Sequence, residues 1–280
     1  MQYSSAAIIV AFAATNVFAH GVIDSVVGAN GVTMPGLSVA DGTPRDCPSP
    51  GCGAEADTTV FKANAGALGK TATGAVSASK MVAVFMDGAN GNTTATIKAR
   101  EEHEAMMLRR SLGKRAANGG TKTPAGTKET AVKAATGMGA AKGMPTTSDA
   151  GVVTMTFHQV NQDGAGPLTA AVDATSGGAD ASAFKTADVT TNVPGIGIGG
   201  LSAAQTMDFP VAIQMPAGMT CSGSVGGASN VCVAKLQNSA LAGPFGGSVA
   251  FTQSPAAKKR AIEYNLSKRR FARALAADEE

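Results

Sequence analysis

Gly151-Val-Val-Thr-Met-Thr-Phe-His158 is the stretch that decides the fold class. Val153, Met155 and Phe157 alternate with polar residues, so one face of an extended segment is apolar and the other is polar. This alternation predicts a half-buried β-strand, because successive side chains of a strand point to opposite faces. His158 lies near the end of this strand, on its polar face.

Similar short apolar segments occur on both sides of this strand, separated by turns rich in Gly, Pro, Asn and Asp. They are residues 81–86, 170–173, 208–214 and 230–234. The chain is also rich in Gly, Ala, Thr and Val, which suits short strands and many turns better than long helices. We therefore predict an all-β fold, an immunoglobulin-like β-sandwich with long loops.

Two segments do not fit the strand pattern. Residues 98–115 predict a short helix with Ala105, Leu108 and Leu112 on one side. The residues that follow are mostly Gly, Ala, Thr and Lys, and they carry too little apolar surface to offset the entropy of ordering them. We predict a mobile, low-complexity insertion at about 113–148, within a single β-sandwich domain that spans 20–254.

The C-terminal segment 255–280 predicts a basic tail with a short helix. From Lys258 onward the chain has seven Lys and Arg residues against four Asp and Glu residues, and the rest of the chain is neutral. The tail is interpreted as solvated rather than as a specific binding arm. No basic stripe with aromatic residues is visible in the body, which argues against a nucleic-acid-binding protein.

The N-terminus reads as a cleavable signal peptide, residues 1–19. Ile8 to Phe18 is a short apolar run without charge, and small side chains stand at Val17 and Ala19, the two positions that a signal peptidase recognises before it cleaves. The run is shorter than the roughly 20 apolar residues that span a membrane. The alternative is a buried N-terminal strand. We predict a secreted, extracellular protein that begins at His20 and does not insert into membranes.

Four cysteines remain in the mature chain: Cys47, Cys52, Cys221 and Cys232. An even number in an exported chain predicts disulfides, and the sequence allows three pairings. The two local pairings, Cys47–Cys52 and Cys221–Cys232, are the simplest. A zinc site is the alternative, but the CxxC spacing typical of zinc is absent. Asn92-Thr-Thr is a candidate N-glycosylation site beside a predicted turn.

An ordered set of short motifs spans roughly residues 20–253. They are His20-Gly-Val-Ile, Thr43-Pro-Arg-Asp-Cys47, Phe157-His-Gln-Val-Asn161, Asp163-Gly-Ala-Gly-Pro167, Asp208-Phe-Pro, Gln214-Met-Pro-Ala-Gly218, Cys221-Ser-Gly, Asn230-Val-Cys232 and Ala242-Gly-Pro-Phe-Gly-Gly247. Together they resemble the Egh-type (Gas- or Mas-type) secreted virulence factors of fungi. The resemblance implies a protein made when the fungus forms its appressorium, the structure with which it penetrates its host.

The chain departs from this family at three positions where the family usually has Cys. They hold Ala170, Leu236 and Ser248. If the family uses these cysteines as disulfides, this chain lacks about two of them.

His20, as the predicted N-terminal residue, could chelate a metal through its α-amine and its ring Nδ1. His158 is the preferred second ligand, with His103 as the alternative. Such a site resembles the histidine brace of the lytic polysaccharide monooxygenases, which are secreted β-sandwiches that use copper, and nitrogen donors suit Cu(II). Phe245 or Phe251 could fill the axial position. The alternative is that His20 is only what the signal peptidase leaves behind, and that His158 hydrogen-bonds a turn.

No catalytic residue is assigned from the sequence. A Gly-x-Ser-x-Gly elbow is absent, no acidic pair stands out, and the mature body has no Trp or Tyr to bind a polysaccharide surface. Whether the protein is an enzyme is left open. The function predicted from the resemblance is a non-catalytic factor at the fungal surface or host cell wall, with a wall polysaccharide or host surface component as partner. The alternative is a copper-binding protein similar to a lytic polysaccharide monooxygenase.

Overall fold

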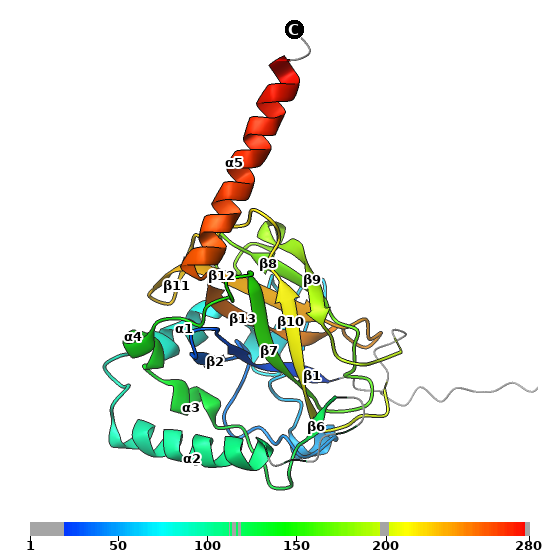
Figure 1. Cartoon of the computed structure of the whole chain (residues 1–280). Coiled ribbons are helices and arrows are strands. Elements are labelled where there is room, and N and C mark those ends of the chain that lie inside the picture. The colour runs from blue at the N-terminus through cyan, green and yellow to red at the C-terminus, as the bar shows by residue number, and fades with distance from the viewer. Residues whose placement is uncertain (1–19, 112, 114–115, 117–118, 197–201, 278–280) are drawn as a thin grey trace, which may run out of the picture.

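The structure, a computed structural model, describes residues 20–111, 113, 116, 119–196 and 202–277. The predicted signal peptide, residues 1–19, lies outside the described residues. Figure 1 shows a β-rich body, helices packed on one side of it, and a long C-terminal helix that runs away from it.

Thirteen strands of the described part join in one antiparallel sheet. They are β1 (Gly21–Val27), β2 (Thr33–Pro35), β3 (Thr59–Val60), β4 (Lys70–Thr71), β5 (Gly74–Ala75), β6 (Thr121–Lys122), β7 (Val152–Gln159), β8 (Thr169–Asp173), β9 (Lys185–Thr191), β10 (Met207–Gln214), β11 (Gly223–Val225), β12 (Ala228–Gln237) and β13 (Phe245–Thr252). Their order is β2-β1-β7-β10-β9-β8-β12-β13-β3-β4-β5, with β6 beside β10 and β11 beside β12.

Strand β7 is third in this order, between β1 and β10, and it confirms the predicted alternation of buried and polar side chains. Val153, Met155 and Phe157 are buried in the main apolar core, and Thr154 is exposed. The strands expected at 170–173, 208–214 and 230–234 are also present, as β8, β10 and β12.

The sheet curls until β13 packs against β1, which is not its neighbour in the hydrogen-bonded order. A Cβ atom at Gly247 would lie 2.7 Å from the backbone nitrogen of Ile23, so only glycine permits this approach. The amide of Leu37 donates to the carbonyl of Ser248 at 2.8 Å across the same seam. The structure confirms a fold that is mostly antiparallel β-sheet, but it adds helices, so the prediction of an all-β fold holds only in part. The sandwich resembling lytic polysaccharide monooxygenases is not confirmed, because β9 joins β10 to β8 in one curled half-barrel.

The described helices are α1 (Ala78–Met86), α2 (Thr94–Ser111), α3 (Ala131–Ala135), α4 (Met138–Lys142) and α5 (Pro255–Ala277), with 3-10 turns at Pro50–Cys52 and Ala181–Ala183. The prediction of a strand at 81–86 is wrong, since these residues form α1. Its buried side chains, Ala78, Met81, Val82 and Phe85, recur at helical spacing. A six-residue apolar run fits a strand equally well, and this explains the error.

Helix α2 confirms the helix expected near 98–115, and its buried residues differ from the apolar residues expected on one side of it. Leu108 is 64% exposed, whereas Thr96, Ala99 and Arg110 are buried. Leu112 lies outside the described residues. The helix is therefore anchored by small side chains and one arginine rather than by a leucine stripe.

The segment expected as a long loop at 113–148 contains regular structure instead: strand β6 and helices α3 and α4. Ala134 and Ala135 are buried, and so is the carboxylate of Glu129. Small side chains let these short helices pack closely. Polar contacts to residues distant in the sequence add stability that the small apolar surface of the segment cannot provide.

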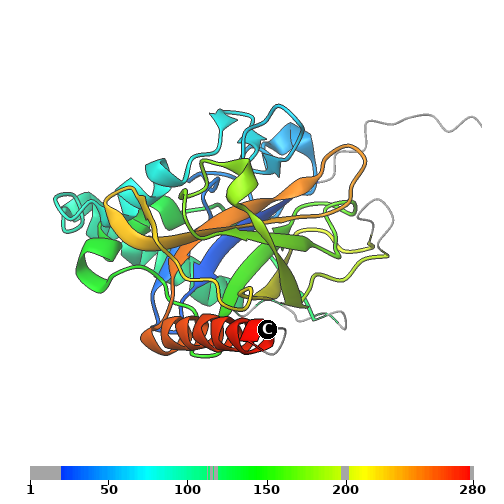
Figure 2. The ribbon, with the colours of Figure 1, turned by 90° about the horizontal axis from the view of Figure 1, so that it is seen from above.

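Helix α5 occupies the predicted C-terminal tail. The hydroxyl of Ser254 accepts a hydrogen bond from the amide of Ala257 and caps its first turn. Ala257 and Ala261 are buried against the body, and from Glu263 to Ala274 every side chain is exposed. In the view from above, α5 lies at one side of the curled sheet (Figure 2).

The three positions where the resemblance implies Cys are all buried. Ala170 and Leu236 lie directly opposite each other on β8 and β12. An apolar pair thus occupies a place where two cysteines would be neighbours.

Candidate functional site

A network of buried charges lies between the sheet, the end of α2 and the segment before α3. At its centre is Arg45, which is fully buried. Its guanidinium donates to both carboxylate oxygens of Asp57, at 2.9 and 2.7 Å, and to Glu129 at 3.0 Å. Such paired hydrogen bonds to carboxylates are the strong ones in proteins.

Arg110, on the last turn of α2, extends this network to the sheet. It donates to Asp208 on β10 at 2.7 and 3.0 Å and to Asp24 on β1 at 3.2 Å. The next strand contributes His158, whose Nδ1 lies 2.7 Å from Asp208 Oδ1. His158 and Asp208 are cross-strand partners in the register of β7 and β10.

Burial and charge act in opposite directions on these carboxylates. Burial raises the pKa of Asp24 and Asp208, but the arginines outweigh it, so each pKa lies below its ordinary value. Glu129 behaves differently, because burial and repulsion from Asp24 raise its pKa to about 7 despite Arg45. The carboxyl groups of Asp24 and Asp208 are therefore ionised beside Arg110, whereas the carboxyl group of Glu129 binds a proton readily.

A cavity of about 570 Å³ opens beside this network. It lies between helices α2, α3 and α4 and strands β1 and β2, and Asp24 is part of its wall. Polar and charged side chains on its wall include Asn92, Arg100, His103 and Glu104, and Met107 and Met138 add apolar surface. This size is in the range of small-ligand sites in proteins.

Two of the polar wall residues are held in place. Arg100 donates to the carbonyls of Ala134 and Thr136, at 3.0 and 2.9 Å. His103 Nδ1 lies 3.0 Å from the hydroxyl of Thr130, and burial lowers the pKa of this histidine. The wall is thus pre-formed by contacts between α2 and the α3 segment.

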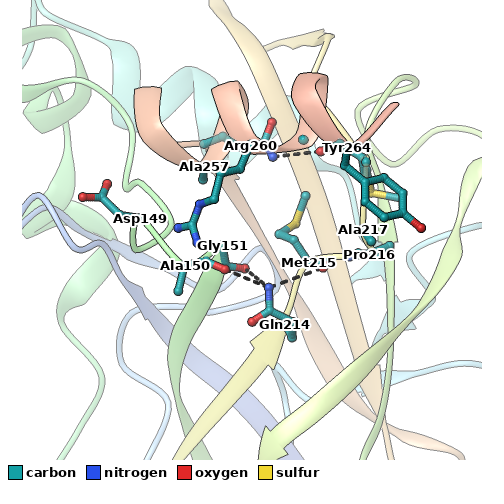
Figure 3. Close-up of a pocket in the computed structure, with 14 residues that line it drawn as sticks. Asp149, Ala150, Gly151, Gln214, Met215, Pro216, Ala217, Ala257, Arg260 and Tyr264 are labelled. Carbon is teal, nitrogen blue, oxygen red and sulfur yellow. Dashed lines mark hydrogen bonds between the residues drawn. The ribbon is translucent and has the colours of Figure 1, made fainter. Parts of the chain in front are cut away.

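A second cavity, of about 290 Å³, lies where α5 meets the body (Figure 3). Arg260 and Tyr264 line it from the helix, and Gln214 and Met215 line it from the end of β10. Gln214 Nε2 donates to the carbonyl of Ala150 at 2.9 Å. We interpret this cavity as the joint between α5 and the sheet.

His20, the predicted N-terminal residue, is 8% exposed and contacts a different set of residues. Its backbone nitrogen donates to Asn161 Oδ1 at 2.8 Å, and its Nδ1 lies 3.1 Å from Glu55 Oε1. Its ring packs on Phe245, with 4.7 Å between centroids. Burial and repulsion from Asp163 raise the pKa of Glu55 to about 7.

The three histidines therefore lie in three different settings. The contacts described for His20 and His158 share no residue, and His103 lines the large cavity. His158 is fully buried rather than open on a polar face, because Arg110 and Asp208 cover it. Within the described ranges, no three His, Cys, Asp or Glu side chains are grouped to hold a metal ion. The pairing of His20 with His158 as copper ligands stays a prediction.

Both local disulfides are present, Cys47–Cys52 and Cys221–Cys232. Asn92 is exposed in the turn between α1 and α2. None of the described helices is long and apolar enough to cross a membrane.

Sequence reasoning missed the charge network and the cavity. Three members of the network stood inside quoted motifs: Arg45 in Thr43-Pro-Arg-Asp-Cys47, His158 in Phe157-His-Gln-Val-Asn161, and Asp208 in Asp208-Phe-Pro. Asp24, Arg110 and Glu129 carried no signal of their own, because they meet only after the chain has folded.

Comparison with known proteins gives a consistent result. The family model described as Egh16-like virulence factor matches residues 18–246. The appressoria-specific virulence factor GAS2 of Pyricularia oryzae is 66% identical over 287 residues, covering 100% of this chain and 99% of that protein. The appressoria-specific virulence factor GAS1 of the same fungus is 39% identical over 129 residues, 45% of this chain and 50% of that protein. No solved structure matches this chain.

Proposed function

The chain belongs to the Egh16-like virulence factor family, and we propose that it is a secreted factor that acts at the fungal surface or host cell wall during penetration. It acts by binding rather than by catalysis, and its ligand is a saccharide segment of a cell-wall polymer. The virulence-associated role follows from its relatives. The location and the mode of action are the proposal.

The cavity between α2, α3 and α4 carries this proposal. Its wall combines hydrogen-bonding groups from Arg100, His103 and Glu104 with the apolar side chains of Met107 and Met138. A sugar presents the same combination, with hydroxyl groups around its edge and C–H groups on its faces. The volume of about 570 Å³ suits a short saccharide segment rather than a whole polymer surface.

The pairing of the nearby charges favours binding over catalysis. Arg100 donates to two backbone carbonyls, and Asp24 is paired with Arg110. A general acid or base needs a proton that it can exchange with a substrate, whereas Arg100 is held by backbone carbonyls and Asp24 by an opposite charge.

Binding is tested with the secreted protein and insoluble wall polymers, such as chitin, β-glucan and pectin, in a sedimentation assay. Soluble oligosaccharides of the retained polymer are then titrated by calorimetry. Glu104→Gln and Met107→Ala change the cavity wall and should each weaken binding at least about tenfold. Matched controls are Glu102→Gln and Leu108→Ala, which lie on the same helix outside the wall.

Equal affinity in the wall and control variants would exclude this cavity as the binding site. Release of cleaved or oxidised sugars by the purified protein would contradict the non-catalytic mode of action.

Copper binding at His20 is the second candidate function. It is favoured by His158, whose buried Nε2 has no hydrogen-bond partner among the described residues, while Nδ1 contacts Asp208. Carboxylates orient metal-binding histidines in this manner. The ligand set predicted from the sequence is the α-amine and ring of His20 with His158 as the third ligand, and loss of Cu(II) affinity in His158→Ala would support that set.

A further inference from the structure

We propose that the mature N-terminus forms a copper site in which Glu55, not His158, supplies the third protein ligand. The inference deepens the second candidate function and rests on cleavage before His20. Its ligands are the α-amine nitrogen of His20, His20 Nδ1 and a carboxylate oxygen of Glu55.

The spacing of the two side chains suits a shared metal ion. His20 Nδ1 and Glu55 Oε1 lie 3.1 Å apart. Two adjacent ligands that each bind one metal at about 2.0–2.2 Å are separated by about 3 Å when they subtend a right angle. Ring and carboxylate therefore need little movement to become ligands of one ion.

The backbone nitrogen of His20, which becomes the α-amine after cleavage, lies close to Glu55 through Asn161. The backbone nitrogen of His20 donates to Asn161 Oδ1 at 2.8 Å, and Asn161 Nδ2 donates to Glu55 Oε1 at 3.2 Å. Cleavage of the bond before His20 converts this amide nitrogen into a primary amine. When the lone pair of the amine binds metal, an N–H group is still available to Asn161, so this contact can persist.

The local charge also favours a cation. The side chains of His20 and Glu55 are only 10% and 11% exposed, so an ionised Glu55 is an acidic group largely shielded from solvent. A divalent ion would offset this buried negative charge. Phe245 packs on the His20 ring and limits access from that side. Two nitrogen donors and one carboxylate oxygen suit Cu(II), the strongest binder of the divalent series.

His158 has a different set of contacts. Its Nδ1 contacts Asp208, which is bonded to Arg110, and the whole side chain is buried in that network. Binding copper together with His20 would require one of the two rings to leave its present contacts. Glu55 needs no such change.

The test uses full-length protein secreted by a fungal host, with its N-terminus verified as His20 by mass spectrometry. Cu(II) is titrated by calorimetry, and frozen-solution electron paramagnetic resonance counts the nitrogen ligands. Glu55→Gln keeps the shape of the side chain and should weaken Cu(II) binding at least about tenfold. A protein that retains Ala19 should lose stoichiometric binding. Glu102→Gln, next to His103 and outside the cavity wall, is the matched control and should bind Cu(II) as the unmodified protein does.

We expect two nitrogen ligands in the unmodified protein and unchanged affinity in His158→Ala. Three nitrogen ligands, or full affinity in Glu55→Gln, would overturn the Glu55 assignment while copper binding itself stands. The nitrogen count needs no variant, so the assignment can be refuted even if His158→Ala fails to fold. No binding by protein that begins at His20 would refute both the assignment and the copper-binding function.

Discussion

Arg45→Met should destabilise the fold by about 4 kcal/mol, because it removes the cation at the centre of a buried network. Arg45 is fully buried, bonds Asp57 and Glu129, and lies 3.5 Å from Asp24. Removing one partner of a buried ion pair costs about 3–5 kcal/mol, since the remaining charge stays buried without compensation. Met fills most of the volume of the arginine side chain, so the loss reports charge rather than a cavity.

The free energy of unfolding is measured by urea denaturation at pH 7. A loss of about 4 kcal/mol corresponds to a change on the order of a thousandfold in the unfolding equilibrium. With a slope of about 3 kcal/mol per molar urea, the midpoint falls by more than about 1 M. Lys98→Met is the matched control, because Lys98 pairs with Glu102 at an exposed position and should leave the midpoint unchanged.

A second change separates charge from packing. If the unpaired carboxylate causes the loss, Asp57→Asn in the Arg45→Met background should restore at least about 1 kcal/mol. A loss below about 1 kcal/mol in the single variant, or no recovery in the double variant, would refute the electrostatic explanation.

Three further predictions concern other parts of the molecule. The pKa of Glu129 is raised from 4.5 to about 7, so the native state keeps a proton that the unfolded chain releases. Stability should therefore fall as the pH rises from about 4.5 to 7, and Glu129→Gln should reduce this slope in denaturation curves taken across that range; an unchanged slope would contradict the shift. Replacing Cys221 and Cys232 with Ala should cost about 3 kcal/mol, since their disulfide closes a loop with a sequence separation of 11 residues between buried side chains; a melting temperature equal to that of the unmodified protein would exclude this role. Truncation after Ser267 should leave the melting temperature of the body unchanged, because α5 is exposed from Glu263 to Ala274; a clear decrease would mean that the outer half of α5 packs on the body.

The sequence predicted β7 because its alternation is long and is interrupted by no glycine or proline. It failed at α1, where Met81 to Met86 is a continuous apolar run that carries no period of its own. The helical spacing becomes visible only when Ala78 is included with Met81, Val82 and Phe85. A helix buried against a sheet and a buried strand share this composition, so a short window does not separate them.

The segment at 113–148 shows a different limit. Its composition predicts a loop because it lacks large apolar residues, yet Glu129 is fixed by Arg45, which lies 84 positions earlier in the chain. The same reason explains why the buried network was missed. Its members come from β1, the loop after β2, α2, the segment before α3, β7 and β10. No local sequence pattern predicts that these side chains come into contact.

The resemblance carried more of the function than the residue patterns did. It led to the family that the comparisons show, while the copper ligands were chosen by residue type alone. His158 was preferred for its place on the polar face of a strand, and α2 covers that face with Arg110. Glu55 lies in a turn whose sequence gives no indication that it will lie beside His20.

The seam between β1 and β13 has a consequence for how the chain folds. Ile23 and Gly247 come into contact although more than 200 residues separate them in the sequence. Contacts of such high sequence separation form late and slow folding, since a long loop must close before they contribute. During synthesis, strand β1 therefore cannot pack against β13 until almost the whole chain has emerged from the ribosome. A chain in this state exposes apolar strand surface, so chaperones that prevent aggregation should matter more for this protein than for one built from local contacts.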